Sequence, residues 1–129
     1  MTVVLAAMVL GACGGGPKPL TVKGDGSGPS IGWEQVVTRH TDECWTTPAW
    51  EEPSQLAVVF WARGTRIGDD GHLILPDGSL VTSGDVVGTL GLMKPLKDWP
   101  ETEEEVRDTC GDLAVTDVAP ALDPKVVSP

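Results

Sequence analysis

The run Gln55-Leu-Ala-Val-Val-Phe-Trp61 constrains the fold of this chain more than any other stretch. It is the most hydrophobic segment after the first 30 residues, and its apolar side chains do not alternate with polar ones. A short, continuous apolar run of this kind is typical of a strand that is buried on both faces. We therefore expect it to form the core of a small folded domain.

Turn signals divide the residues that follow this run. The segment Pro76-Asp77-Gly78-Ser79 predicts a hairpin between strands at His72–Leu75 and Leu80–Thr82, because Pro presets φ and Gly tolerates a positive φ. A further strand is expected at Val86–Val87. The glycines of Gly88–Gly91 are typical of bends or bulges in a small curved barrel.

Three further elements and one loop are expected. Trp33–His40 mixes β-branched and polar residues and predicts a first strand, whereas Thr41–Pro53 predicts a loop. A short helix is expected to open at Asp98-Trp99-Pro100-Glu101, because Pro suits a first turn and acidic residues suit the positive end of a helix dipole. It should end near Cys110-Gly111, and Leu113–Val118 predicts a last strand.

Together these elements predict a mainly β fold of five to six short strands, with one short helix near the C-terminal end. A small OB-like or partly open β-barrel is the natural architecture for this pattern. We expect the β domain to cover residues 31–118. Prolines interrupt residues 119–129, for which we expect a disordered tail.

The N-terminal apolar run ends in Leu10-Gly11-Ala12-Cys13. The run is about nine residues long and too short to span a bilayer, which requires about 20. Its ending resembles the lipobox of bacterial lipoproteins, in which the signal peptide is cut before a cysteine that becomes lipidated. The resemblance implies a signal peptide at residues 1–12 and a diacylglyceryl anchor, with or without N-acylation, on Cys13.

One departure from the lipoprotein pattern is that no Lys or Arg precedes the apolar run, although signal peptides normally begin with a basic region. Either the true start lies upstream of Met1, or the resemblance is accidental and the run is a disordered leader with a chance cysteine. The Gly14-Gly15-Gly16 run favours the lipoprotein interpretation.

Residues 13–30 predict a lipidated N-terminus followed by a flexible linker, because they are rich in Gly, Pro and Ser. About 17 such residues have an r.m.s. span of roughly 20–25 Å. The segment Gly24-Asp25-Gly26-Ser27-Gly28 lacks the lysine of a P-loop and the regular acidic ligands of an EF-hand, so we interpret it as linker too.

Two cysteines remain beyond Cys13. In an exported protein, Cys44 and Cys110 are expected to form a disulfide, and the alternative is two unpaired buried thiols. Closing a loop of about 67 residues would stabilise the fold by on the order of 4 kcal/mol in the loop-entropy model.

A second resemblance rests mostly on turns. Three turn motifs follow an apolar strand: Gly64-Thr65-Arg66, Leu75-Pro76-Asp77-Gly78 and Gly84-Asp85-Val86-Val87. Their order is similar to that in small β domains of uncharacterised lipoproteins from high-GC Gram-positive bacteria. The similarity covers roughly Leu56 to Gly91. It implies a fold and a location, and no activity.

The chain is acidic, with 19 Asp and Glu against 9 Lys and Arg and a formal charge of −10. Such a surface disfavours nucleic acid, because affinity for phosphate backbones comes largely from Lys and Arg. It should also be repelled by anionic headgroups, so we expect the domain to hang off the membrane on its lipid anchor.

No catalytic or metal site is predicted. His40, Asp42, Glu43 and Cys44 lie close together, but a divalent metal needs three or four converging ligands, and the other histidine is His72. No Gly-x-Ser-x-Gly elbow is present, and carboxylate pairs can be drawn from 19 acids almost at will. We expect no cofactor and no enzymatic activity, with a small envelope hydrolase as the lesser alternative.

The five tryptophans are the most distinctive part of the composition. Trp61 belongs to the core run, whereas Trp45, Trp50 and Trp99 lie in loops or at the helix start. Exposed Trp residues would suit a cell-wall glycan or an envelope protein partner, and the alternative is that they cover a small core. The sequence thus predicts an extracytoplasmic, lipid-anchored module with a binding or structural role.

Overall fold

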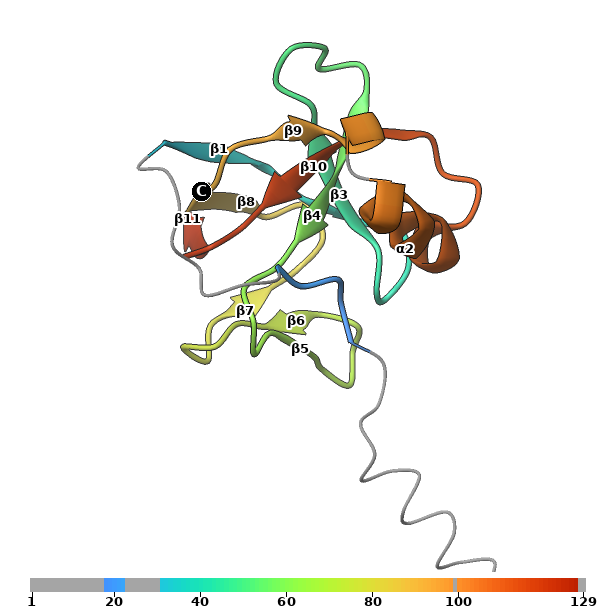
Figure 1. The fold of residues 1–129 in the computed structure, drawn as a ribbon. Helices are drawn as coiled ribbons and strands as arrows, with labels where there is room; N and C mark the ends of the chain where they lie inside the picture. The colour runs from blue at the N-terminus through green and yellow to red at the C-terminus, as the bar shows by residue number, and fades with distance from the viewer. Residues whose placement is uncertain (1–17, 23–30, 99, 128–129) are drawn as a thin grey trace, which may run out of the picture.

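The computed structural model describes residues 18–22, 31–98 and 100–127. Within these ranges the fold is mainly β, with eleven short strands in three sheets, one α-helix and one 3-10 helix (Figure 1). The strands are β1 Gly32–Val36, β2 Thr38–Arg39, β3 Trp45–Pro48, β4 Leu56–Phe60, β5 Arg66–Ile67, β6 Leu73–Ile74, β7 Leu80–Val81, β8 Val86–Leu90, β9 Lys94–Pro95, β10 Val115–Pro120 and β11 Lys125–Val127.

The sheets have the orders β1-β8-β11, β2-β3-β4-β10-β9 and β5-β6-β7. Strand β4 lies at the centre of the five-stranded sheet, antiparallel to β3 and parallel to β10. The described pairings do not close the sheets into a barrel, and there are more strands than the five or six expected. The mainly β class with a helix near the C-terminal end is confirmed.

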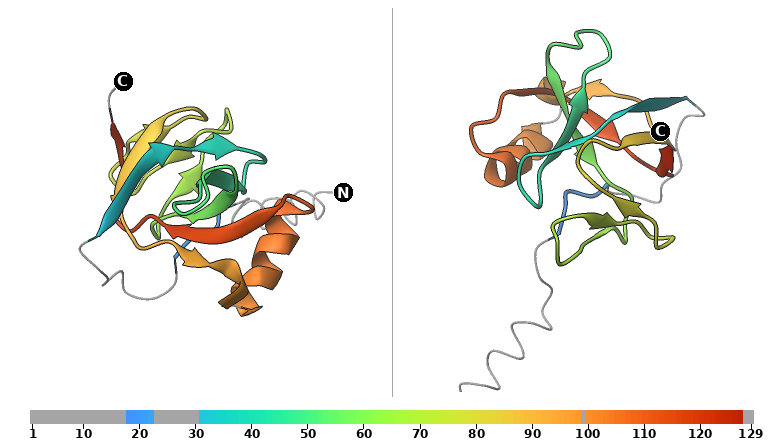
Figure 2. Two further views of the ribbon diagram at one scale, coloured as in Figure 1. Left: turned by 90° about the horizontal axis from the view of Figure 1, so that it is seen from above. Right: turned by 180° about the vertical axis from the view of Figure 1, so that it is seen from behind.

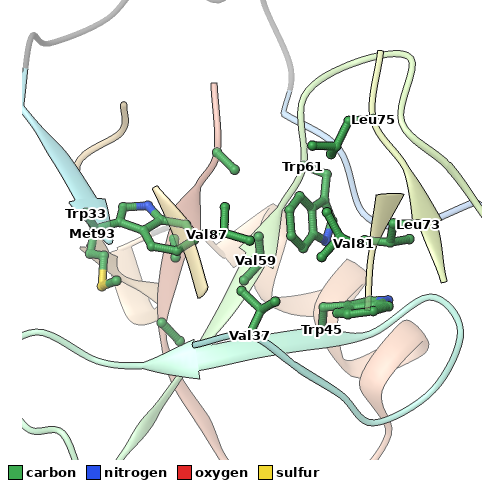
Figure 3. Close-up of a cluster of buried hydrophobic side chains, with 13 residues drawn as sticks. Trp33, Val37, Trp45, Val59, Trp61, Leu73, Leu75, Val81, Val87 and Met93 are labelled. Atoms are coloured by element: carbon green, nitrogen blue, oxygen red, sulfur yellow. The ribbon is translucent and has the colours of Figure 1, made fainter. Parts of the chain in front are cut away.

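The prediction that the apolar run is buried on both faces is confirmed, because four of the five residues of β4 are buried and they contribute to two separate clusters. Ala57 and Val59 face what we call the larger core, to which strands of all three sheets contribute (Figure 3). The larger core contains Trp33, Val37, Trp45, Ala57, Val59, Trp61, Leu73, Leu75, Val81, Val87, Met93, Ala119 and Ala121.

The opposite face of β4 presents Val58 and Phe60 to what we call the smaller core. Its members are Leu20, Cys44, Val58, Phe60, Leu96, Val106 and Val118. The helix α2 (Pro100–Cys110) contributes Val106 to it, and the 3-10 helix η1 (Leu96–Asp98) contributes Leu96.

The predicted helix is confirmed, with local reasons for both ends. The helix begins at a proline. The backbone N–H of a first helical residue has no partner within the helix, so the lack of this N–H in proline costs no hydrogen bond. Gly111, with φ +63°, follows its last residue, and the Gly111 N–H donates to the Arg107 carbonyl at 2.9 Å. A left-handed glycine in this position is a common helix stop.

The hairpin turn is also confirmed, as β6 and β7 pair around Leu75–Ser79. Gly78 has φ +91°, and Asp77 accepts a hydrogen bond from the Ser79 N–H at 2.9 Å. Strand β5 adds to the other side of β6 and completes the small sheet.

The expected first strand is in fact two strands that belong to different sheets. Between β1 and β2 lies Val37, which is fully buried. Its N–H donates to Asp85 O at 2.9 Å, and its carbonyl accepts from Gly84 N at 2.8 Å. The chain therefore leaves the β1 sheet at Val37 and enters the five-stranded sheet.

The loop expected at Thr41–Pro53 contains a strand, so this prediction is wrong in part. Strand β3 lies between β2 and β4, and its residues Trp45, Thr46 and Thr47 are buried. The two threonines suit a pleated, buried position, but they give no apolar signal in the sequence.

The expected domain of residues 31–118 is too short at both ends. Residues 119–127 are not a disordered tail, because β10 continues to Pro120, Ala121 is fully buried, and β11 pairs with β8. At the other end, the linker expected at residues 13–30 includes Leu20, which is 5% exposed, and Thr21, which forms a parallel bridge with Trp61.

No helix in the described part of the chain has the length and hydropathy needed to cross a bilayer.

Candidate functional site

The predicted disulfide between Cys44 and Cys110 is confirmed, with a Cα–Cα distance of 5.3 Å. It joins the residue before β3 to the last residue of α2 and lies against the smaller core. Neither thiol is therefore available as a nucleophile or a metal ligand. The predicted lipidation site, Cys13, lies outside the described residues.

Trp45 does not belong to a binding surface, which corrects the sequence interpretation. Its side chain is fully buried, and its ring packs edge to face against Trp61 with centroids 6.0 Å apart (Figure 3). Its indole N–H donates to Asp42 O at 3.2 Å. The alternative, that tryptophans fill a small core poor in other aromatics, describes Trp45 correctly.

The other tryptophans differ in exposure. Trp33 is buried and donates its indole N–H to Pro120 O at 2.9 Å, while Trp61 is buried and its Nε1 has no described hydrogen-bond partner. Trp50 follows β3 and is 37% exposed. The placement of Trp99 lies outside the described residues, so Trp50 is the described candidate for a tryptophan contact surface.

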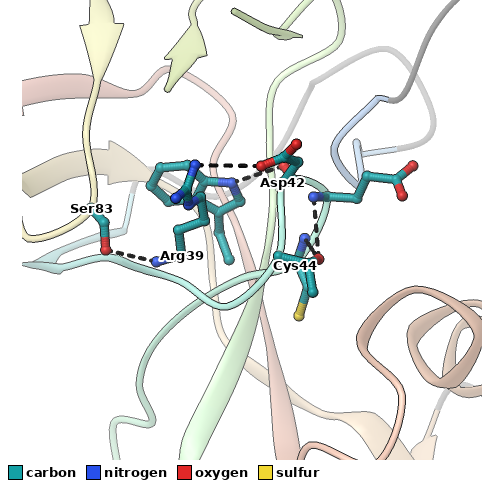
Figure 4. Close-up of polar contacts among 7 residues, drawn as sticks. Arg39, Asp42, Cys44 and Ser83 are labelled. Carbon is teal, nitrogen blue, oxygen red and sulfur yellow. Dashed lines mark hydrogen bonds and ion pairs between the residues drawn. The ribbon is translucent and has the colours of Figure 1, made fainter. Parts of the chain in front are cut away.

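Polar contacts hold the loop between β2 and β3 (Figure 4). Arg39 Nη1 lies 3.4 Å from Asp42 Oδ1, and the Arg39 N–H donates to Ser83 Oγ at 2.9 Å. The Cys44 N–H donates to Thr41 Oγ1 at 3.0 Å, and His40 Nε2 lies 2.8 Å from Thr46 Oγ1. Among the described residues there is no group of three or more His, Cys, Asp and Glu side chains that could hold a metal ion.

A hollow of about 720 Å³ lies on the described surface beside the N-terminal segment 18–22. This segment, blue in Figure 1, passes between the end of β4 and the β5-β6-β7 sheet. It is fixed there by two backbone hydrogen bonds, Val22 N to Trp61 O and Trp61 N to Leu20 O, both 2.8 Å long. We call this hollow the N-terminal pocket.

A tight turn after β4 forms another wall of the N-terminal pocket. The Thr65 N–H and Oγ1 both contact Ala62 O, at 3.1 and 2.7 Å, and Gly64 has φ +95°. The turn places Arg63 and Arg66 on the lining of the pocket, together with Lys18 from the N-terminal segment. All three are exposed to solvent.

The charge around the N-terminal pocket is opposite to that of the whole chain. Its lining carries the cations Lys18, Arg63 and Arg66 and the carboxylates Asp42 and Asp69. Asp42 is already paired with Arg39, which lies against Gly71. The lining thus holds three cations and two carboxylates, one of which is paired with Arg39, in a chain of formal charge −10.

This arrangement is suited to holding an anion. Arg guanidinium groups offer several N–H donors in a fixed fork that matches carboxylate and phosphate oxygens. The N-terminal pocket was missed at the sequence level, because Lys18 lay in a predicted linker and Arg63 and Arg66 in a turn. A pattern that could have drawn attention to it is the pair of arginines around Gly64-Thr65 in an otherwise acidic chain.

Comparison with protein-family models, with curated proteins and with solved structures finds no match to this chain.

Proposed function

We propose that this protein is an exported lipoprotein, held at the extracytoplasmic face of the cell membrane by lipids on Cys13, and that its β domain is a non-enzymatic binding or structural module. The observation that carries this proposal is the Cys44–Cys110 disulfide. Disulfides persist in oxidising compartments outside the cytoplasm and are rare inside it. The Leu10-Gly11-Ala12-Cys13 sequence further supports export by a signal peptide and anchoring by lipids on Cys13.

We also propose that the three sheets act as a partly open, OB-like barrel. Strands of all three sheets contribute side chains to the larger core. In addition, Gln35 of β1 donates to Pro48 O of β3 at 2.6 Å, which joins two sheets that share no strand pairing in the described residues.

The anchor is tested by the Cys13→Ala variant of the full chain, expressed in a bacterium that lipidates lipoproteins. We expect wild-type protein to incorporate a labelled fatty acid and to sediment with membranes, and Cys13→Ala to lose the label. The Cys44→Ala/Cys110→Ala double variant is the control, because it keeps Cys13 and should still be labelled. Fatty-acid labelling that persists in Cys13→Ala would contradict the proposal.

A second candidate function is recognition of a cell-wall glycan or an envelope protein through Trp50. Its partial exposure next to Glu51 and Glu52 favours this, since Trp is enriched in binding hot spots. Ligand binding should then be weakened by Trp50→Ala but not by alanine at the exposed Leu80. Equal affinity of both variants for a glycan or partner that binds wild type would reject the Trp50 surface.

A further inference from the structure

The N-terminal segment 18–22 shortens the length of chain between a lipid on Cys13 and the folded domain. Leu20 is buried in the smaller core, and Leu20 and Val22 are hydrogen-bonded to Trp61. The chain is thus attached to the domain from about Lys18 onward. The five residues from Cys13 to Lys18 can span at most about 18 Å, so the effective tether is much shorter than a linker ending at Ser30.

A short tether also restricts which face can meet the membrane. The chain leaves the domain at Lys18, which lines the N-terminal pocket. The blue segment 18–22 lies next to the β5-β6-β7 sheet (Figure 2). The N-terminal pocket lies on this side of the domain, because Lys18, Thr21 and residues of β5 line it. An anchor on Cys13 would therefore hold this side close to the headgroups, and the headgroup layer is rich in phosphate.

We propose that the N-terminal pocket binds a phosphate group, with Lys18, Arg63 and Arg66 as its cationic contacts. The membrane orientation rests on the proposed function, whereas phosphate binding itself does not. A phosphate carries more negative charge and more acceptor oxygens than a carboxylate, and three cations on one lining match it better. The phosphate comes either from an anionic phospholipid headgroup or from a soluble phosphoester.

The N-terminal pocket would also reconcile the acidic chain with a position near the membrane. Most of the surface repels anionic headgroups, while this one region attracts them. The domain would then have one preferred orientation on the membrane, with the remaining acidic surface turned outward.

The test compares wild-type protein with two variants of equal charge change. Lys18→Gln/Arg66→Gln removes two pocket cations, whereas Lys97→Gln/Arg107→Gln removes one Lys and one Arg from η1 and α2, neither of which lines the N-terminal pocket. Purified full-length protein in an uncharged detergent is titrated with glycerol phosphate, and unfolding is followed by tryptophan fluorescence. Ligand that binds the folded state raises the unfolding temperature.

We expect glycerol phosphate to stabilise wild type and the η1–α2 variant equally. The pocket variant should bind at least about tenfold more weakly, because it loses two charged donors to the phosphate. Acetate at matched ionic strength is the control for general anion effects. Stabilisation by acetate equal to that by glycerol phosphate, or equal weakening in both variants, would overturn the proposal.

A second arm identifies the source of the phosphate. The same proteins are reconstituted into vesicles of phosphatidylcholine alone or mixed with phosphatidylglycerol. Pocket-dependent stabilisation by phosphatidylglycerol assigns the site to a headgroup, and stabilisation by glycerol phosphate alone assigns it to a soluble ligand. No pocket-dependent effect in either arm would reject the site. The Cys13→Ala labelling experiment tests only the lipid anchor, and the phosphate titration tests only the N-terminal pocket. A failure of the anchor hypothesis can therefore be told apart from a failure of the phosphate-site hypothesis.

Discussion

The two faces of β4 are covered in different ways. The larger core contains three buried tryptophans and side chains from all three sheets. The smaller core consists of seven buried residues, which come from the N-terminal segment, two central strands, one short helix and its 3-10 extension, and the disulfide cysteine Cys44. One side therefore relies on aromatic area, whereas the other relies on a covalent link.

The disulfide and one buried tryptophan contribute similar free energies. A buried Trp removes about 150–250 Å² from water, which corresponds to about 5 kcal/mol at about 25 cal/mol per Å². The loop closed by Cys44 and Cys110 spans 66 positions, and its closure contributes about 4 kcal/mol in the loop-entropy model. The disulfide thus gives the smaller core about as much as one further tryptophan would.

The largest expected effect is that of Trp45→Ala. It removes a fully buried ring from the larger core, together with its edge-to-face contact with Trp61. We expect a loss of about 3–5 kcal/mol in the free energy of unfolding, measured by urea titration. Trp50→Ala is the matched control and should change stability by about 0.5 kcal/mol or less. Similar losses in both variants would contradict the packing described for Trp45.

The next effect is the removal of the disulfide. The Cys44→Ala/Cys110→Ala variant should lose about 2–5 kcal/mol, and its native-state amide exchange should accelerate first in α2, which packs on the smaller core. Amides of β4 and β8 should keep more of their protection. Uniform acceleration across all strands would show that the two cores unfold as one unit and would remove the distinction between them.

The smallest effect concerns the β6-β7 turn beside the larger core. The hydrogen bond from the Ser79 N–H lowers the pKa of Asp77 below its ordinary value of 3.8. A carboxylate with a lowered pKa in the folded state stabilises the fold above its unfolded pKa, and this contribution is lost as the pH falls through the folded pKa. Asp77→Asn should therefore slightly lower the unfolding temperature at neutral pH.

The same variant provides its own control through pH. The difference in unfolding temperature between wild type and Asp77→Asn should shrink as the pH falls below 3.8. A difference that is the same at neutral and acid pH would mean that the carboxylate charge is not its source.

The parts of the fold that sequence predicted correctly have local causes. The β6-β7 turn and the two ends of α2 depend on Pro and Gly at particular positions, and β4 on one continuous apolar run. The disulfide followed from counting cysteines. Apart from the disulfide, each of these signals lies within a few residues of the element that it determines.

The parts that sequence missed depend on partners outside the segment itself. Strand β3 is buried because β2 and β4 flank it, and β11 is ordered because it pairs with β8. Trp45 is core because Trp61 and its neighbours surround it, while Trp50, five residues later, is partly exposed. The N-terminal pocket exists because the bridge between Thr21 and Trp61 brings Lys18 beside Arg66.

The parallel pairing of β4 with β10 has a consequence for the order of folding. Val58 pairs with Val118, so the central sheet cannot be completed before nearly all of the described chain is present. Contacts between residues so distant in sequence slow folding, because a long loop must close before the contact contributes any stability. If the chain crosses a membrane from its N-terminus, β4 has no partner on this edge until β10 emerges.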